Sequence, residues 1–181
     1  MKNLIILSGE ACAGKTTVGE ALAGRLGYRF LSVGGHIREF ARERYQLEIH
    51  AFQNLCAANP EIDRQLDHYF CQKIQESLDQ GVGMVVDFRM GAHFFPAAMS
   101  IYLQVSPGIV RQRLAGRKGE DFASLSMRNA QSRSRLLEIY GYDYVAESNY
   151  RHVIDTDSLT SAQIVGQIVR LREGRSVDSL G

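Results

Sequence analysis

The chain begins with a phosphate-loop pattern, and no other feature limits its fold so strongly. Residues 8–17 read SGEACAGKTT and follow the apolar run Leu4–Leu7. They match G-x-x-x-x-G-K-[ST], in which the fixed residues are Gly9, Gly14, Lys15 and Thr16. Such a loop surrounds phosphate groups with backbone N–H groups at the start of a helix. The pattern therefore predicts a strand, a glycine-framed loop and a helix, in that order.

The side chains of this loop have separate predicted roles. Lys15 can reach the β- and γ-phosphates of a nucleoside triphosphate, and the Thr16 hydroxyl is placed to hold magnesium. The alternative is a chance match in an ordinary strand-to-helix turn, but the apolar run before the motif and the helical pattern after it argue against that. We predict that the loop binds the nucleotide through Gly9, Glu10, Ala11, Cys12, Ala13, Gly14, Lys15, Thr16 and Thr17.

Short apolar runs that alternate with helical patterns predict an α/β fold. Helical spacing follows the loop over 14–26. A second helix is expected to begin at Asn59-Pro60, because a cap residue followed by proline favours a helix start. Further helices are predicted at 107–114 and 160–172. The runs that read as parallel strands buried on both faces are 3–8, 29–32, 83–87, 100–106 and 152–156.

Length and composition exclude several classes of protein. A chain of 181 residues is consistent with one domain over 1–181, and its net charge of +1 gives no general case for nucleic acid or an anionic membrane. Its apolar runs are too short for a membrane span. Three cysteines without C-x-x-C spacing argue against a disulfide framework or a zinc site. We expect a cytoplasmic monomer with neither nucleic-acid nor membrane partners.

A carboxylate and an arginine follow the third predicted strand. Asp87 ends the apolar run 84–86, where a second magnesium ligand of a phosphate-loop protein is expected. The alternative is an aspartate that caps the next turn. Arg89 lies two residues further on, so in an extended chain it points to the same side as Asp87. An arginine there would face the phosphates.

Basic residues are concentrated in one stretch of the second half of the chain. Residues 111–135 contain seven basic and two acidic residues. A solvated helix face is the usual explanation, but such a face normally pairs its bases with acids four residues away. A polyanionic ligand fits better, since phosphoryl transfer needs cations around the transferring oxygens. The basic residues are Arg111, Arg113, Arg117, Lys118, Arg128, Arg133 and Arg135.

Four segments resemble the cytidylate kinases, which are P-loop nucleoside monophosphate kinases. They read SVGGHIREFARER, NPEIDRQLD, VVDFRMGAHFFP and RSRLLEIYGYD, within a resemblance that covers about residues 3–170. The resemblance implies an α/β fold of the P-loop nucleoside triphosphate hydrolase type, with a five-stranded parallel sheet flanked by helices. It also implies an acceptor-binding insertion at about 35–80 and a lid at about 113–130.

The resemblance also implies roles for individual residues. Arg38 and Arg89 match arginines that hold the acceptor's phosphate, and Arg113 and Arg117 match lid arginines near the ATP phosphates. The family pattern R-x-x-x-(acid)-x-x-R falls on Arg128, Ser132 and Arg135.

The chain departs from the family mainly at residues that surround the acceptor nucleoside. Ser132 replaces a carboxylate, Phe88 replaces a glycine, and Met90 stands where the bacterial branch has an aspartate that recognises cytosine. Cys12 and Gly35 also replace the usual glycine and aspartate. The phosphate-handling residues are kept, so the chemistry is predicted more firmly than the acceptor base.

These observations predict an ATP- and Mg²⁺-dependent kinase that converts CMP, dCMP or a related pyrimidine nucleotide to the diphosphate. The predicted catalytic residues are Lys15, Arg89, Arg113, Arg117, Arg128 and Arg135, and the predicted metal ligands are Thr16 and Asp87. Two alternatives stay open. One is a small-molecule kinase with a hydroxyl acceptor, for which Asp87 would be the base, and the other is a nucleotide-binding regulatory module with little turnover.

Overall fold

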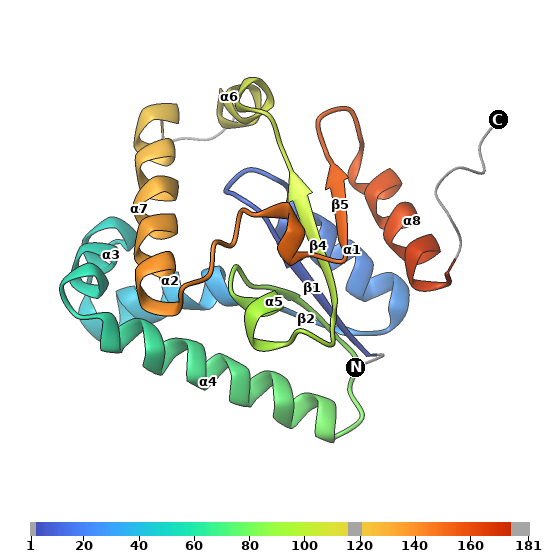
Figure 1. Ribbon diagram of the computed structural model, residues 1–181, viewed down its shortest axis with the longest axis horizontal. Helices are drawn as coiled ribbons and strands as arrows, with labels where there is room; N and C mark the ends of the chain where they lie inside the picture. Colours follow the sequence, from blue (N-terminus) through green and yellow to red (C-terminus); the bar gives the residue numbers. More distant parts are fainter. Residues whose placement is uncertain (1–2, 116–120, 175–181) are drawn as a thin grey trace.

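A computed structural model describes residues 3–115 and 121–174 and contains one five-stranded parallel sheet (Figure 1). The strand order is β2-β3-β1-β4-β5. Each strand lies within two residues of a predicted run at either end, which confirms the α/β class and the parallel sheet. The strands are β1 (Leu4–Ser8), β2 (Arg29–Ser32), β3 (Met84–Asp87), β4 (Met99–Gln104) and β5 (His152–Asp155).

Helices cover both faces of the sheet. The side chains of a buried strand point alternately to the two faces, so each strand contributes to two cores. Ile5 and Leu7 of β1 pack in one core with α1 (Lys15–Leu26) and α8 (Ser161–Arg172). Leu4 and Ile6 face the opposite core, to which α2 (Val33–Tyr45), α3 (Ile49–Ala58) and α4 (Pro60–Asp79) contribute. In Figure 1, α1 and α8 lie on the right and α2 and α3 on the left, with α4 below.

Local signals account for several of the helix ends. The Asn59 side chain accepts a hydrogen bond from the Glu61 N–H, 3.3 Å away, at the predicted start of α4. The predicted helices at 107–114 and 160–172 correspond to α6 (Pro107–Ala115) and α8. The helices α2, α3 and α7 (Phe122–Tyr140) were not predicted as separate elements, and α5 (Gly91–Phe94) is a single turn. Within the two described ranges, no helix combines the length and the apolar character that a membrane crossing requires.

The sheet order brings polar side chains together at its carboxyl edge. In the strand register Asp87 lies opposite Leu7 of β1 and opposite Ser32 of β2. The loop between β1 and α1 therefore begins beside Asp87. Crevices at the carboxyl ends of parallel strands are where open α/β sheets bind ligands, so this edge is where a site is expected.

Candidate active site

The phosphate loop has a backbone shape that only particular residues adopt easily. Gly9, Cys12 and Gly14 have φ values of 140°, 67° and 90°. A Cβ atom on Gly9 would lie 2.5 Å from the backbone oxygen of Leu103, so glycine is required there. Cys12 takes a left-handed conformation although it is not glycine, and its side chain is buried against Leu114 and neighbouring apolar residues.

Lys15 lies within the curve of this loop. Its Nζ donates a hydrogen bond of 2.8 Å to the backbone oxygen of Glu10. Burial lowers the pKa of Lys15, and the charge of Asp87 partly opposes this effect. An anion that enters the loop would stabilise the charged form of this buried ammonium group. The position is therefore well suited to bind phosphate.

Hydroxyl and carboxylate oxygens meet beside the loop. The Thr16 and Ser32 hydroxyls each donate to Oδ2 of Asp87 over 3.4 Å, and Asp87 is buried. Magnesium prefers hard oxygen ligands of this kind. The arrangement fits a magnesium ion held by Thr16 and Asp87, although no group of three or more His, Cys, Asp or Glu side chains arranged to hold a metal occurs among the described residues.

One cavity of about 510 Å³ connects the loop with the helices α3, α4 and α7. Its lining includes most of the residues predicted from the sequence. The predicted residues outside that lining are Gly9, Glu10, Ala13 and Arg113, while Arg117 lies outside the described residues. Those inside are Ala11, Cys12, Gly14, Lys15, Thr16, Thr17, Arg38, Asp87, Arg89, Arg128, Ser132 and Arg135.

Arg89 is held by two side chains that the sequence analysis did not identify. Its Nη2 donates to Oδ1 of Asn129 over 3.2 Å, and its guanidinium lies 5.2 Å from the centre of the Tyr144 ring. A cation over an aromatic face is an attractive contact. Asn129 belongs to α7, so the orientation of Arg89 depends on a helix that begins 33 residues later in the chain, at Phe122.

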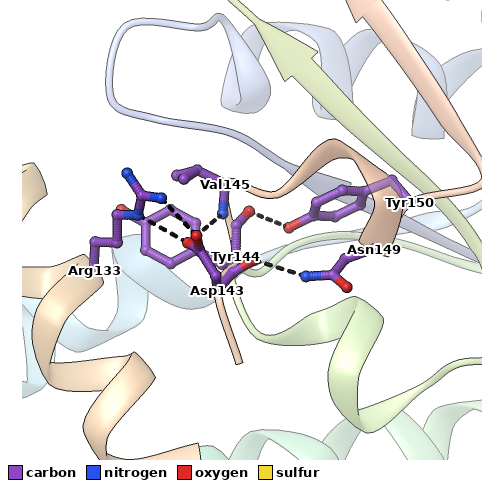
Figure 2. A network of polar contacts seen from close by, with 6 residues as sticks. All are labelled: Arg133, Asp143, Tyr144, Val145, Asn149 and Tyr150. Atoms are coloured by element: carbon purple, nitrogen blue, oxygen red, sulfur yellow. Dashed lines mark hydrogen bonds and ion pairs between the residues drawn. The ribbon is translucent and has the colours of Figure 1, made fainter. Parts of the chain in front are cut away.

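A hydrogen-bond network fixes Tyr144 in turn (Figure 2). Arg133 of α7 binds both carboxylate oxygens of Asp143, and the Asn149 amide donates to the Asp143 carbonyl over 2.8 Å. The Tyr150 hydroxyl donates to the carbonyl of Tyr144 over 2.6 Å. The segment between α7 and β5, which carries Tyr144, is therefore tied down by several hydrogen bonds.

Unlike the other predicted site arginines that the structure describes, Arg113 does not line the cavity. It lies on α6, and its guanidinium donates to the carbonyls of Cys12 and Thr156 over 2.9 and 2.7 Å. These bonds tie the phosphate loop to the end of β5, outside the cavity. A role for Arg113 and Arg117 in a lid at 113–130 stays a prediction.

The helices α3, α4 and α7 enclose one part of the cavity. Arg135 of α7 forms an ion pair with Asp63 of α4, with Nε 2.9 Å from Oδ2, and donates to the carbonyl of Gln53 on α3 over 3.3 Å. Ser132 is buried and accepts a weak contact of 3.5 Å from the Gln53 amide. Asp67 completes this group. The sequence signal for Asp63 and Asp67 is their spacing of four residues, which places two carboxyl groups on the same face of one predicted helix.

Comparisons with known proteins agree with this geometry. A family profile described as an AAA domain matches residues 5–134. Cytidylate kinase from Methanothermobacter thermautotrophicus is 31% identical over 159 residues, which cover 85% of this chain and 95% of that protein. An S-adenosylmethionine-dependent nucleotide dehydratase from Lacinutrix mariniflava is 38% identical over 173 residues, 93% of this chain but 36% of that protein. The chain thus spans about a third of the dehydratase.

The fold also has solved relatives. Shikimate kinase from Bacteroides thetaiotaomicron superposes with a TM-score of 0.60 at 20% identity, over 94% of this chain and 98% of that one. At this identity the similarity shows the fold alone. The identity to cytidylate kinase over nearly its whole length shows more, and it confirms the resemblance found in the sequence. The chain belongs to the cytidylate kinase-like family of P-loop kinases.

Proposed function

We propose that this protein is an ATP- and Mg²⁺-dependent nucleoside monophosphate kinase, and that its acceptor is CMP, dCMP or a related pyrimidine nucleotide. The observation that carries the proposal is the continuity of one cavity. The cavity runs from Lys15 and the loop to the enclosed group of residues on α3, α4 and α7, with Arg38 and Arg89 also in its lining. Donor and acceptor phosphates could therefore meet inside one space lined by cations.

The chain's own residues act by positioning and by charge. Lys15 and the loop N–H groups bind the β- and γ-phosphates, Arg38 and Arg89 orient the acceptor phosphate, and Arg128 adds positive charge near the transferring oxygens. A magnesium ion on Thr16 and Asp87 would neutralise charge on the ATP phosphates. Since a phosphate monoester has a second pKa of about 6, the acceptor oxygen is already ionised at neutral pH. No general base is then needed.

The dehydratase relative favours a nucleotide acceptor over a small alcohol. That protein is named for an activity on nucleotides, and about a third of it is similar to this chain. A second candidate is therefore a kinase that phosphorylates a modified nucleotide, connected with nucleotide dehydration. An acceptor set that contains both ordinary and dehydrated pyrimidine nucleotides separates the two.

The test is ADP release from ATP, measured in a coupled assay with each acceptor in turn. CMP, dCMP, UMP, dehydrated CMP, AMP, GMP and a hydroxy acid such as shikimate form the set, and Lys15→Ala is the control for contaminating kinases. We expect release that depends on a pyrimidine monophosphate and is absent in the variant. Release only with the hydroxy acid, or slow release that no acceptor stimulates, would contradict the proposal.

A further inference from the structure

Two carboxyl groups of α4 lie in the enclosed part of the cavity, and only one of them has a cation as partner. Asp63 and Asp67 are separated by one helical turn, so they lie on the same face of the helix. Asp63 pairs with Arg135 over 2.9 Å. Asp67 is 7% exposed and lines the same cavity, yet no ion pair reaches it from the described residues.

The contacts of Asp67 leave one of its oxygens for a ligand. Its Oδ2 accepts a hydrogen bond of 2.7 Å from the Tyr140 hydroxyl of α7, and none of the described residues supplies a hydrogen bond to Oδ1. Oδ1 is not one of the fully buried polar atoms without a partner, so it is reached from the cavity. A ligand that displaces water from this oxygen must supply a polar group in its place.

The surroundings of Asp67 also favour its neutral form. Burial raises the pKa of Asp67 to about 7, and Asp63 acts in the same direction, against the Tyr140 hydrogen bond and the charge of Arg135. The other titratable groups that interact with it are the thiols of Cys56 on α3 and Cys71 on its own helix. At or below neutral pH, a substantial fraction of Asp67 therefore carries a proton that it can donate.

We propose that Asp67 is the residue that recognises the acceptor's base, and that it reads an amino group next to a ring nitrogen, as in cytosine. The inference rests on the proposed function. In the neutral form Oδ1 carries the proton and donates it to the N3 acceptor of cytosine, while Oδ2 accepts from the 4-amino group with the lone pair that Tyr140 does not use. Phe88, Met90 and Leu66 supply apolar walls for the ring.

Uracil fits this subsite less well for a chemical reason. Its N3–H lies between two carbonyl oxygens, so an ionised Asp67 that accepts from N3–H would bring its second oxygen against a carbonyl oxygen with no proton between them. A neutral Asp67 can form two hydrogen bonds with uracil, but its O–H then donates to a carbonyl oxygen, which is a weaker acceptor than the cytosine ring nitrogen. The preference for cytosine therefore rests on the stronger hydrogen bond from the acid proton to N3. Asp67 therefore supplies from α4 the base recognition that Met90 and Ser132 cannot.

The test compares Asp67→Asn and Asp67→Leu with wild type in equilibrium binding of CMP and UMP, and in the kcat/KM for each. Asn has the shape and hydrogen-bonding pattern of the neutral acid, so it should keep CMP affinity within about threefold and keep the preference for CMP. Leu should weaken CMP binding and reduce the CMP-to-UMP ratio by about tenfold or more, with ATP affinity unchanged. Asp79→Asn, on an exposed turn of the same helix, is the matched control.

The pH profile distinguishes recognition from a merely structural role. As pH rises from about 6 to about 8, wild-type CMP affinity should fall relative to Asp67→Asn, because only the wild-type side chain loses its proton. The wild-type-to-variant ratio cancels the titration of CMP itself. Tyr140→Phe removes the hydrogen bond to Oδ2 alone and should leave the CMP-to-UMP ratio unchanged.

Three results would overturn the inference. If Asp67→Leu left the CMP-to-UMP ratio unchanged, or if Tyr140→Phe lowered it as much as Leu does, Asp67 would not read the base. Equal losses in Asn and Leu would show that the neutral acid is not the recognising form. If wild type bound ATP but neither pyrimidine nucleotide, the proposed function itself would fail, and the inference with it.

Discussion

Asp67→Asn should change the pH dependence of folding stability, independently of any ligand. The pKa of Asp67 is about 7 in the folded chain, against an ordinary value of 3.8. Between these values the folded state holds a proton that the unfolded state has released. The stabilising proton is fully present below the unfolded pKa, and the free energy of unfolding falls as pH rises towards 7.

The size of the effect follows from the two pKa values. At 1.36 kcal/mol for each pH unit, the interval from 3.8 to about 7 corresponds to about 4 kcal/mol. Native domains are stable by only about 5–15 kcal/mol, so ionisation of Asp67 costs this protein a large share of its stability at alkaline pH. Asparagine cannot ionise, and its side-chain oxygen can still accept from Tyr140, as Oδ2 of Asp67 does over 2.7 Å.

Urea unfolding of both proteins from about pH 5 to about pH 8 measures this effect. From about pH 5 to about pH 8 the free energy of unfolding of the variant should rise by about 3 kcal/mol relative to that of wild type, because wild type loses stability over the roughly two pH units between pH 5 and its folded pKa of about 7. Asp79→Asn, which changes an exposed acid on the same helix, should differ from wild type by less than about 0.5 kcal/mol throughout. A difference between Asp67→Asn and wild type that does not change with pH would refute the reasoning.

Two further outcomes test the phosphate end of the cavity, and a third tests the backbone of the phosphate loop. Lys15→Ala should lower kcat at least ~100-fold in the ADP-release assay, because it removes the cation at the transferring phosphate; activity within a few-fold of wild type would count against the loop's role. Arg89→Ala should raise the acceptor KM and lower kcat with little change in ATP affinity, and a selective loss of ATP binding would reverse that assignment. Gly9→Ala should destabilise the fold by about 2 kcal/mol or more in thermal unfolding, because its Cβ would meet the Leu103 oxygen at 2.5 Å. Gly24→Ala, whose Cβ has no neighbour within 4 Å, should cost nothing, and equal losses in the two variants would contradict the argument.

Local sequence patterns were sufficient to predict the sheet and the phosphate loop. Each strand is a continuous apolar run, because both of its faces are buried, and the loop has a fixed spacing because its backbone must curve around phosphate. Asp87 could also be placed beside Thr16 from the sequence. The carboxyl ends of neighbouring parallel strands meet at one edge, so a residue that ends a strand has a predictable position.

The tertiary structure decided which distant side chains meet, because that depends on how helix faces pack rather than on spacing along the chain. Asp63 and Arg135 are far apart in sequence, and only the packing of α4 against α7 makes them a pair. Tyr144 lies under Arg89 because a hydrogen-bond network holds the segment after α7 in place. Asp67 was one acid among several in a predicted helix, and its burial in the cavity distinguishes it. Burial and pairing are properties of the packed whole, so the sequence determined the phosphate loop and Asp87, whereas the fold alone shows which residues surround the enclosed part of the cavity.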